Sequence, residues 1–270
     1  MRPTLLLAGS LLLAGPLAAQ RGAGDDTLRA RLAITSVPVT REGGTSPAVS
    51  ISSPTGYGAD AGLAFAGVGF QQRTRYTNQK DGAIVAGFGV GDARRLVGLE
   101  AAVTSYSLGR RHAPGEVGSV SFKLHRLLPA DFAIGAGVEN VAHWGDTDAG
   151  RSPYVALSRV FLLNQDPRLR FGALVLNAGV GGGRFRSERD VNEKKNVVSP
   201  FGSAALFVAE PVTLVADWTG QDLAAGVSFL PFRGVPLVFT PAWADLTRRA
   251  GDGPRFILGI GYGLRYRTPF

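Results

Sequence analysis

The chain has 270 residues, of which 37 are glycine and none is cysteine, and its formal net charge is +8. Without cysteine it has no disulfide framework, no thiolate nucleophile and no zinc site built on cysteine. No segment after the N-terminal leader has the eighteen or more consecutive apolar residues typical of a transmembrane helix. The apolar residues also lack a helical period, so the composition favours strands and turns.

The first residues have the pattern of a secretory signal peptide. Arg2 precedes an apolar run over residues 5–17, and small residues follow at Ala18 and Ala19. A basic residue, an apolar run and a small-residue cleavage site in this order predict a signal peptide over residues 1–19. We therefore expect export from the cytoplasm, and nucleic acid is not an expected partner.

Residues 20–60 are rich in Gly, Ser, Thr and Pro, with one short alternating patch over 28–39. This composition is typical of a partly ordered leader before the first strand. A periplasmic extension and a plug inside a barrel are the alternatives.

After Tyr57 the sequence alternates between apolar and small or polar residues, which is the period of a β-strand. Strands are predicted over residues 61–73, 82–91, 95–107, 116–126, 130–142, 152–162, 168–180, 199–208, 211–219, 222–230, 235–244 and 255–267. Their number is even, and each is close to the roughly 9–11 residues that a tilted strand needs to cross a bilayer. The predicted connections alternate between long and short, except that 220–221 is short where a long one is expected.

The last strand carries the clearest signal. Residues 255–270 place Phe256, Leu258, Ile260, Tyr262, Leu264 and Tyr266 on one face and mostly glycine and arginine on the other. The chain ends at Phe270, with aromatic residues at alternate positions before it. This ending resembles the assembly signal of Gram-negative outer-membrane β-barrels, with Tyr266 and Phe270 in the signal positions.

This resemblance implies a closed antiparallel transmembrane β-barrel of about twelve strands over residues 61–270, in the outer membrane, with the barrel-assembly machinery as a partner. The stretches SPTGYGADAGLAFAGVGF, DGAIVAGFGVGD and VGLEAAVTSYS are similar to a family of uncharacterised bacterial barrels. The stretch DWTGQDLAAGVSF is similar to barrel segments of proteins associated with exopolysaccharide secretion. Neither similarity implies a catalytic motif.

On a barrel, the face opposite the apolar one lines the lumen, because a charge on the lipid face costs about 2–4 kcal/mol near the bilayer midplane. Strand 168–180 is ambiguous, because Arg168 and Arg170 share a face with Leu174 and Leu176. The charged residues expected in the lumen are Glu100, Lys123, His125, Glu139, Arg159, Asp217, Arg265 and Arg267.

Basic residues concentrate in the connections expected on the outer side. Those expected to bind lipopolysaccharide phosphates or another anion are Arg110, Arg111, Arg184, Arg186, Arg189, Lys194, Lys195, Arg248 and Arg249. Guanidinium groups suit phosphate and carboxylate oxygens. The simpler interpretation is a solvated rim that also contacts outer-membrane lipid. The more specific one is a vestibule that collects anions above a pore.

No motif predicts an enzyme, a cofactor or a metal site. The glycine runs at 87–92, 179–184 and 259–263 lack the helix or the lysine of a phosphate-binding loop. Of the three histidines, only His143 lies near carboxylates in sequence, at Asp146 and Asp148, and no nucleophile stands beside it. The same aspartates lack the remaining donors of a calcium loop.

Three functions follow from these patterns. The first is a porin-like channel for small, anionic solutes or oligosaccharides, which a lumen dominated by salt bridges would disfavour. The second is a non-conducting structural or surface-interaction barrel that binds lipopolysaccharide or an acidic polysaccharide, or serves polysaccharide export. The third is a secreted soluble β-sandwich.

Overall fold

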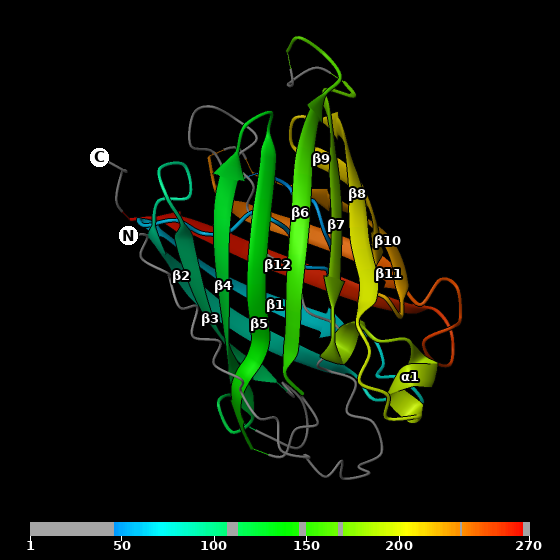
Figure 1. Cartoon of the computed structure of the whole chain (residues 1–270). Coiled ribbons are helices and arrows are strands. Elements are labelled where there is room, and N and C mark those ends of the chain that lie inside the picture. Colours follow the sequence, from blue (N-terminus) through cyan, green and yellow to red (C-terminus); the bar gives the residue numbers. More distant parts are fainter. Residues whose placement is uncertain (1–45, 107–112, 146–149, 167–169, 233, 267–270) are drawn as a thin grey trace, which may run out of the picture.

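The computed structural model describes residues 46–106, 113–145, 150–166, 170–232 and 234–266. They form one antiparallel sheet that closes on itself as a twelve-stranded barrel (Figure 1). The strands are β1 (Leu63–Gln71), β2 (Asp81–Gly91), β3 (Gly98–Tyr106), β4 (Gly118–Leu128), β5 (Phe132–Trp144), β6 (Ser152–Leu162), β7 (Ala173–Gly181), β8 (Ser199–Ala209), β9 (Val212–Trp218), β10 (Leu223–Phe229), β11 (Leu237–Ala244) and β12 (Arg255–Arg265).

Closure is made by the first and last strands. β1 pairs with β12 in continuous register from Leu63 opposite Arg265 to Gln71 opposite Ile257. Every other strand pairs with its sequence neighbours, so the sheet has no free edge. The predicted closed antiparallel barrel is thereby confirmed, and the alternative of a β-sandwich is wrong because there is one closed sheet rather than two packed ones.

The predicted strand positions agree with the structure except at β7. The prediction began this strand at residue 168, whereas it begins at Ala173. The connection before it is longer than predicted, and it is held by the Asn164 side-chain amide, which donates to the Arg170 carbonyl at 2.9 Å. Arg170 therefore lies outside the strand. In β7 itself Asn177 is buried on the inner face and Leu176 is exposed on the outer face.

The predicted alternation of faces is also present in the strands. In β4, Lys123 and His125 are buried, whereas Phe122 and Leu124 are exposed. In β9, Thr213 and Asp217 are buried and Leu214 is exposed. The outer surface of the barrel is therefore apolar, whereas its inner surface combines polar side chains and glycine with buried apolar side chains.

The two ends of the barrel differ in their connections. We call the end with the connections after β1, β3, β5, β7, β9 and β11 the long-loop end, and the other the short-turn end. The connection after β7 carries the 3₁₀ turn η2 (Gly183–Phe185) and the single-turn helix α1 (Glu188–Asn192). No helix in the part of the chain that the structure describes is both long enough and apolar enough to cross a membrane.

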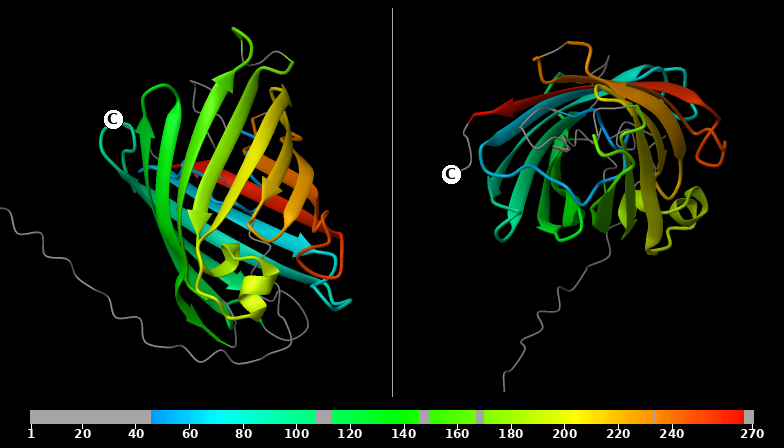
Figure 2. Two further views of the ribbon diagram at one scale, coloured as in Figure 1. Left: turned by 45° about the vertical axis from the view of Figure 1, so that its right-hand side comes forward. Right: turned by 90° about the horizontal axis from the view of Figure 1, so that it is seen from above.

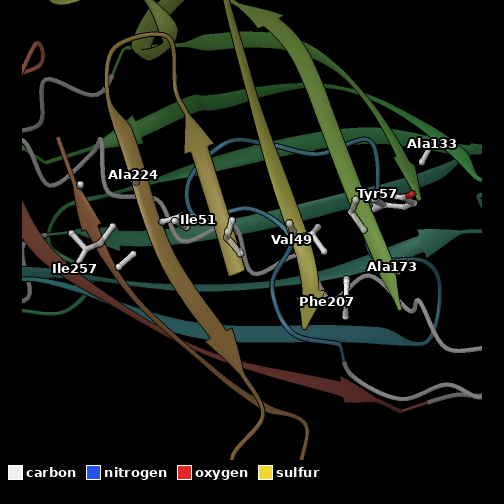
Figure 3. Packing of buried hydrophobic residues seen from close by; sticks show 13 residues of the cluster. Val49, Ile51, Tyr57, Ala133, Ala173, Phe207, Ala224 and Ile257 are labelled. Atoms are coloured by element: carbon white, nitrogen blue, oxygen red, sulfur yellow. The ribbon is translucent and has the colours of Figure 1, made fainter. Parts of the chain in front are cut away.

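Residues 46–60 precede β1 and lie inside the barrel, and we call them the plug segment. The view from above in Figure 2 shows this blue segment crossing the interior of the ring of strands. Its apolar side chains are Val49, Ile51 and Tyr57, all less than a tenth exposed. They pack against small and aromatic side chains of the wall, including Ala133, Ala173, Val175, Ala205, Phe207, Val215, Ala224 and Ile257 (Figure 3).

Glycines in the wall allow the plug segment to approach closely. A Cβ atom on Gly89 would lie 2.0 Å from the carbonyl oxygen of Ala59, well inside van der Waals contact. The approach is mutual, because a Cβ on Gly56 of the plug segment would lie 2.1 Å from the Ala133 carbonyl oxygen of β5. Backbone-to-backbone contact of this kind leaves no space for a side chain.

A methyl group at position 89 should therefore disturb the plug segment. We expect Gly89→Ala to lower the free energy of unfolding by about 1–3 kcal/mol, as overpacking does in tight interiors. Gly150→Ala is the control, because no atom lies within 4 Å of a Cβ built there. Urea unfolding of both variants in detergent micelles measures the difference, and equal midpoints would contradict the packing described.

Candidate functional site in the barrel lumen

Side chains from successive strands bind the backbone of the plug segment. Ser228 and Thr213 bond the N–H and the carbonyl of Ala48, each at 2.8 Å. Farther along, the side chains of Ser203 and Asn177 donate to the carbonyls of Val49 and Pro54 at 3.0 and 2.9 Å. The side chains of Ser158 and Glu100 accept from the backbone N–H groups of Gly56 and Ala59, each at 2.9 Å. These bonds satisfy backbone groups that would otherwise be buried without partners. The lumen wall is thus matched to a peptide backbone.

The strongest attachment is the carboxylate of Asp217, which is fully buried. Its Oδ2 accepts the backbone N–H groups of Ile51, Ser52 and Ser53 at 2.7, 2.9 and 3.1 Å. The hydroxyls of Ser50 and Ser53 donate to the same carboxylate at 2.6 and 2.5 Å. Successive N–H groups around one anion form a nest, and bonds to a charged acceptor are stronger than neutral ones. Five donors therefore stabilise a carboxylate that lies out of contact with water.

Two further polar contacts lie inside the barrel beside the plug segment. Lys123 Nζ lies 3.2 Å from Glu100 Oε1, and both were expected in the lumen. His125 Nε2 lies 3.0 Å from Oδ1 of Asp60, the last residue of the plug segment. These contacts link the β3 and β4 walls to each other and to the plug segment. Lys123 is therefore not available as a free lumenal cation.

Arg184 was expected in an outer loop, and it does lie in the connection after β7, but its guanidinium does not face outward. Its side chain points into the barrel, with Nε 2.5 Å from Glu139 Oε2. Its Nη2 also donates to the carbonyl of Ser52 at 2.7 Å. The loop after β7 folds back over the opening, because buried Phe185 stacks on Phe201 at 4.5 Å between ring centroids. Arg184 consequently pairs with Glu139 and holds the plug segment.

Arg159 was expected in the lumen, and that placement is also wrong. Its neighbour Ser158 is the inward residue, since it bonds Gly56 of the plug segment. Arg159 therefore lies on the outer face, with its guanidinium carbon 4.6 Å from the ring centre of Phe132 and 4.5 Å from that of Phe161. Aromatic faces attract such a cation, which explains an arginine in an apolar position.

The remaining predicted residues separate into three groups. Arg265 is exposed at the short-turn end of β12, and Tyr266 beside it is 57% exposed. Arg189, Lys194, Lys195, Arg248 and Arg249 are exposed at the long-loop end, whereas Arg186 donates to the carbonyls of Gly183 and Lys195. Arg110, Arg111, Arg267 and Phe270 lie outside the described residues, as do Asp146 and Asp148.

A second ionic cluster, at the long-loop end, was not found from the sequence. Arg255 and Arg75 are both 1% exposed and lie 2.9 and 3.4 Å from Oδ2 of Asp222. Burial raises the pKa of Asp222, and the two arginines act in the opposite direction. At the rim, a hydrogen bond from Arg73 lowers the pKa of Asp252. The sequence could have indicated the inward position of Arg255, because Arg255 lies on the same face of the last strand as its glycines.

The described residues include no group of three or more His, Asp or Glu side chains arranged to hold a metal ion. What the lumen does chemically is to bind a peptide backbone, through one anionic nest and a row of small polar side chains. The plug segment crosses the lumen (Figure 2).

Removal of the Asp217 charge should release the plug segment. Because the chain has no cysteine, a single Ala48→Cys substitution reports access to the segment. We expect Asp217→Ala to increase the rate of thiol labelling at position 48 at least about tenfold, since hydrogen bonds to a charge contribute roughly 1.5–3 kcal/mol each. Asp92→Asn, in the turn after β2, is the control. Unchanged labelling in a folded Asp217→Ala barrel would contradict the anchoring role.

No protein-family model matches this chain, and no curated protein matches it. Its architecture is therefore known from its own geometry: a closed twelve-stranded antiparallel barrel whose lumen contains residues 46–60.

Proposed function

We propose that this protein is an outer-membrane pore for small polar solutes, held closed in its resting state by the plug segment. The single observation that carries the proposal is the row of small polar side chains that bonds the plug backbone. Ser228, Thr213, Ser203, Asn177 and Ser158 come from five consecutive strands, β10 to β6. If the plug segment leaves, these groups line a wettable passage.

The apolar outer surface supports the membrane location. Large side chains on different strands are about half exposed, among them Val103, Leu124, Val155, Leu157, Val180 and Leu214. A soluble protein rarely exposes a contiguous apolar surface of this extent, whereas a transmembrane barrel presents such a band to lipid. With a signal peptide at the N-terminus, the long-loop end faces the exterior and the short-turn end the periplasm.

The solute class differs from the sequence-based expectation of an anion. The described carboxylates on the inner face or buried at the long-loop end include Asp81, Glu100, Glu139, Asp217, Asp222 and Asp245, and the cations include Arg75, Lys123, Arg184, Arg255 and Arg265. Positive charge is not in excess, and Arg159 does not belong to this set. Once the plug segment is displaced, Asp217 becomes a carboxylate without its five donors. We therefore propose neutral or cationic polar solutes.

A non-conducting surface-interaction barrel is the second candidate, favoured by the ion pairs inside the barrel, Lys123 with Glu100 and Arg184 with Glu139. The exposed cations at the long-loop end, such as Arg189 and Arg249, would then contact lipopolysaccharide phosphates or an acidic polymer. Conductance separates the two candidates, because only the first has a passage behind the plug segment.

The decisive experiment is planar-bilayer recording of four refolded proteins. We expect the mature wild type to be silent or nearly so, and both Asp217→Ala and a variant lacking residues 20–56 to show stable current steps. Asp92→Asn should remain silent, because Asp92 does not contact the plug segment. If both opened variants carry no current although a heat-induced shift in gel mobility shows that they are folded barrels, the pore is overturned and the second candidate is favoured.

The same recordings test the solute class. The variant lacking residues 20–56 keeps Asp217 and should prefer cations over anions, because a lumenal carboxylate attracts counter-ions in a low-dielectric passage. Adding Asp217→Asn to that variant should reduce the preference. Anion selectivity in both would show that lumenal arginines dominate the passage.

The membrane location has its own test. We expect Val103→Arg, on the outer face of β3, to destabilise the barrel folded in lipid vesicles by about 2–4 kcal/mol. Leu246→Arg, at the long-loop rim, should cost about 0–1 kcal/mol. Equal and small costs at both positions would mean that the outer face contacts water rather than lipid.

A further inference from the structure

Arg159 carries a charge on an otherwise apolar part of the outer face. Its neighbours along β6 on this face are Leu157 and Phe161. Across the sheet, Phe132 of β5 and Leu176 of β7 lie directly opposite it. The guanidinium is therefore surrounded by apolar side chains on both sides and along its own strand.

No residue that the structure describes neutralises this cation. Within the described residues, Arg159 forms no ion pair, and its Nε atom is buried without a hydrogen-bond partner. The rings of Phe132 and Phe161 hold the guanidinium carbon at 4.6 and 4.5 Å. Such stacking fixes the plane of the group but leaves its terminal nitrogen atoms free to donate. The site is thus a positioned donor without an acceptor.

A second outward cation lies two strands away. Arg126 of β4 is exposed and stands opposite Ile134 of β5, next to the pairing of Phe132 with Arg159. Arg126 is aligned through Ile134 with Leu157 of β6, two residues from Arg159. With strands about 4.8 Å apart and about 3.3 Å per residue along a strand, the two arginine backbones are separated by roughly 12 Å. Two long arginine side chains that extend towards each other across this distance can bind the same group between them. Among described residues Arg126 also has no carboxylate partner.

Both arginines lie near the short-turn end, where β4 ends at Leu128 and β6 at Leu162. Further exposed arginines, Arg94 and Arg95, occupy the turn after β2 at this end. In the proposed orientation, this height on the outer face is the headgroup region of the inner leaflet. Lipopolysaccharide lies in the opposite leaflet and would contact the long-loop end.

We propose that Arg159 and Arg126 form a binding site for the phosphate of an anionic phospholipid in the inner leaflet. The guanidinium groups donate to the phosphate oxygens, and Phe132, Phe161 and Ile134 contact the glycerol and acyl chains. This inference rests on the proposed membrane location but not on conductance. The apolar contacts favour a lipid over a free phosphate ion.

The test uses the refolded mature protein and two lipids of the same chain length, phosphatidylglycerol and phosphatidylcholine. Native mass spectrometry of protein released from mixed micelles measures how much of each lipid stays bound. We expect the wild type to retain phosphatidylglycerol preferentially, and Arg159→Gln with Arg126→Gln to reduce that preference roughly tenfold. Inorganic phosphate at millimolar concentration should not displace the lipid.

Arg189→Gln with Arg249→Gln is the matched control, because it removes the same charge from the long-loop end. If both double variants lose the preference for phosphatidylglycerol equally, the preference depends on net charge alone and the proposed site is overturned. Displacement by inorganic phosphate would overturn the choice of a lipid. Insertion into vesicles without any preference for phosphatidylglycerol overturns this inference alone, whereas failure to insert into vesicles of either lipid overturns the membrane location as well.

Discussion

The pairing of β1 with β12 is the constraint on which the rest of the structure depends. A closed sheet leaves no strand with unpaired N–H and carbonyl groups, and this is the condition for a β-structure to exist in hydrocarbon. Closure also divides the side chains into two sets, one outside and one inside. With the outer set apolar, every charged group on a strand must either turn inward or find a particular local solution, as Arg159 does against two phenylalanine rings.

The inward side chains must also fill the interior of the barrel. Barrels of about eight strands can be filled by side chains alone, and a barrel of twelve strands is wider. In this protein a stretch of backbone fills the space. Backbone brings its own polar groups, so the wall must supply acceptors and donors as well as apolar contacts. The alternation of Ser, Thr and Asn with Ala and Val along β6 to β10 satisfies both demands, and Asp217 concentrates the polar part at one point.

The sequence was sufficient for the barrel because period-two alternation and connection positions are local properties. It placed Glu100, Lys123, His125, Glu139 and Asp217 inside for the same reason. The sequence-based prediction for Arg159 was wrong because one of its aromatic partners, Phe132, lies on the neighbouring strand. The sequence of one strand does not show which residues of the next strand lie opposite it. The inward direction of the Arg184 side chain was missed because a loop that folds inward has the same composition as one that extends into water. The plug segment has no periodic pattern, since its partners are wall side chains rather than another strand.

The direction in which the plug segment is attached determines how it would respond to force. At its C-terminal end it continues into β1, and Asp60 is held by His125 and by the backbone N–H of Ala93 at 3.0 Å. A pull on the chain before Ser46 would load the bonds at Ala48 first, then Val49, and only then the nest around Asp217. Bonds that break one after another yield at lower force than bonds loaded together. The segment would peel away while its far end stays fixed, and it could return to the same wall when the tension is released.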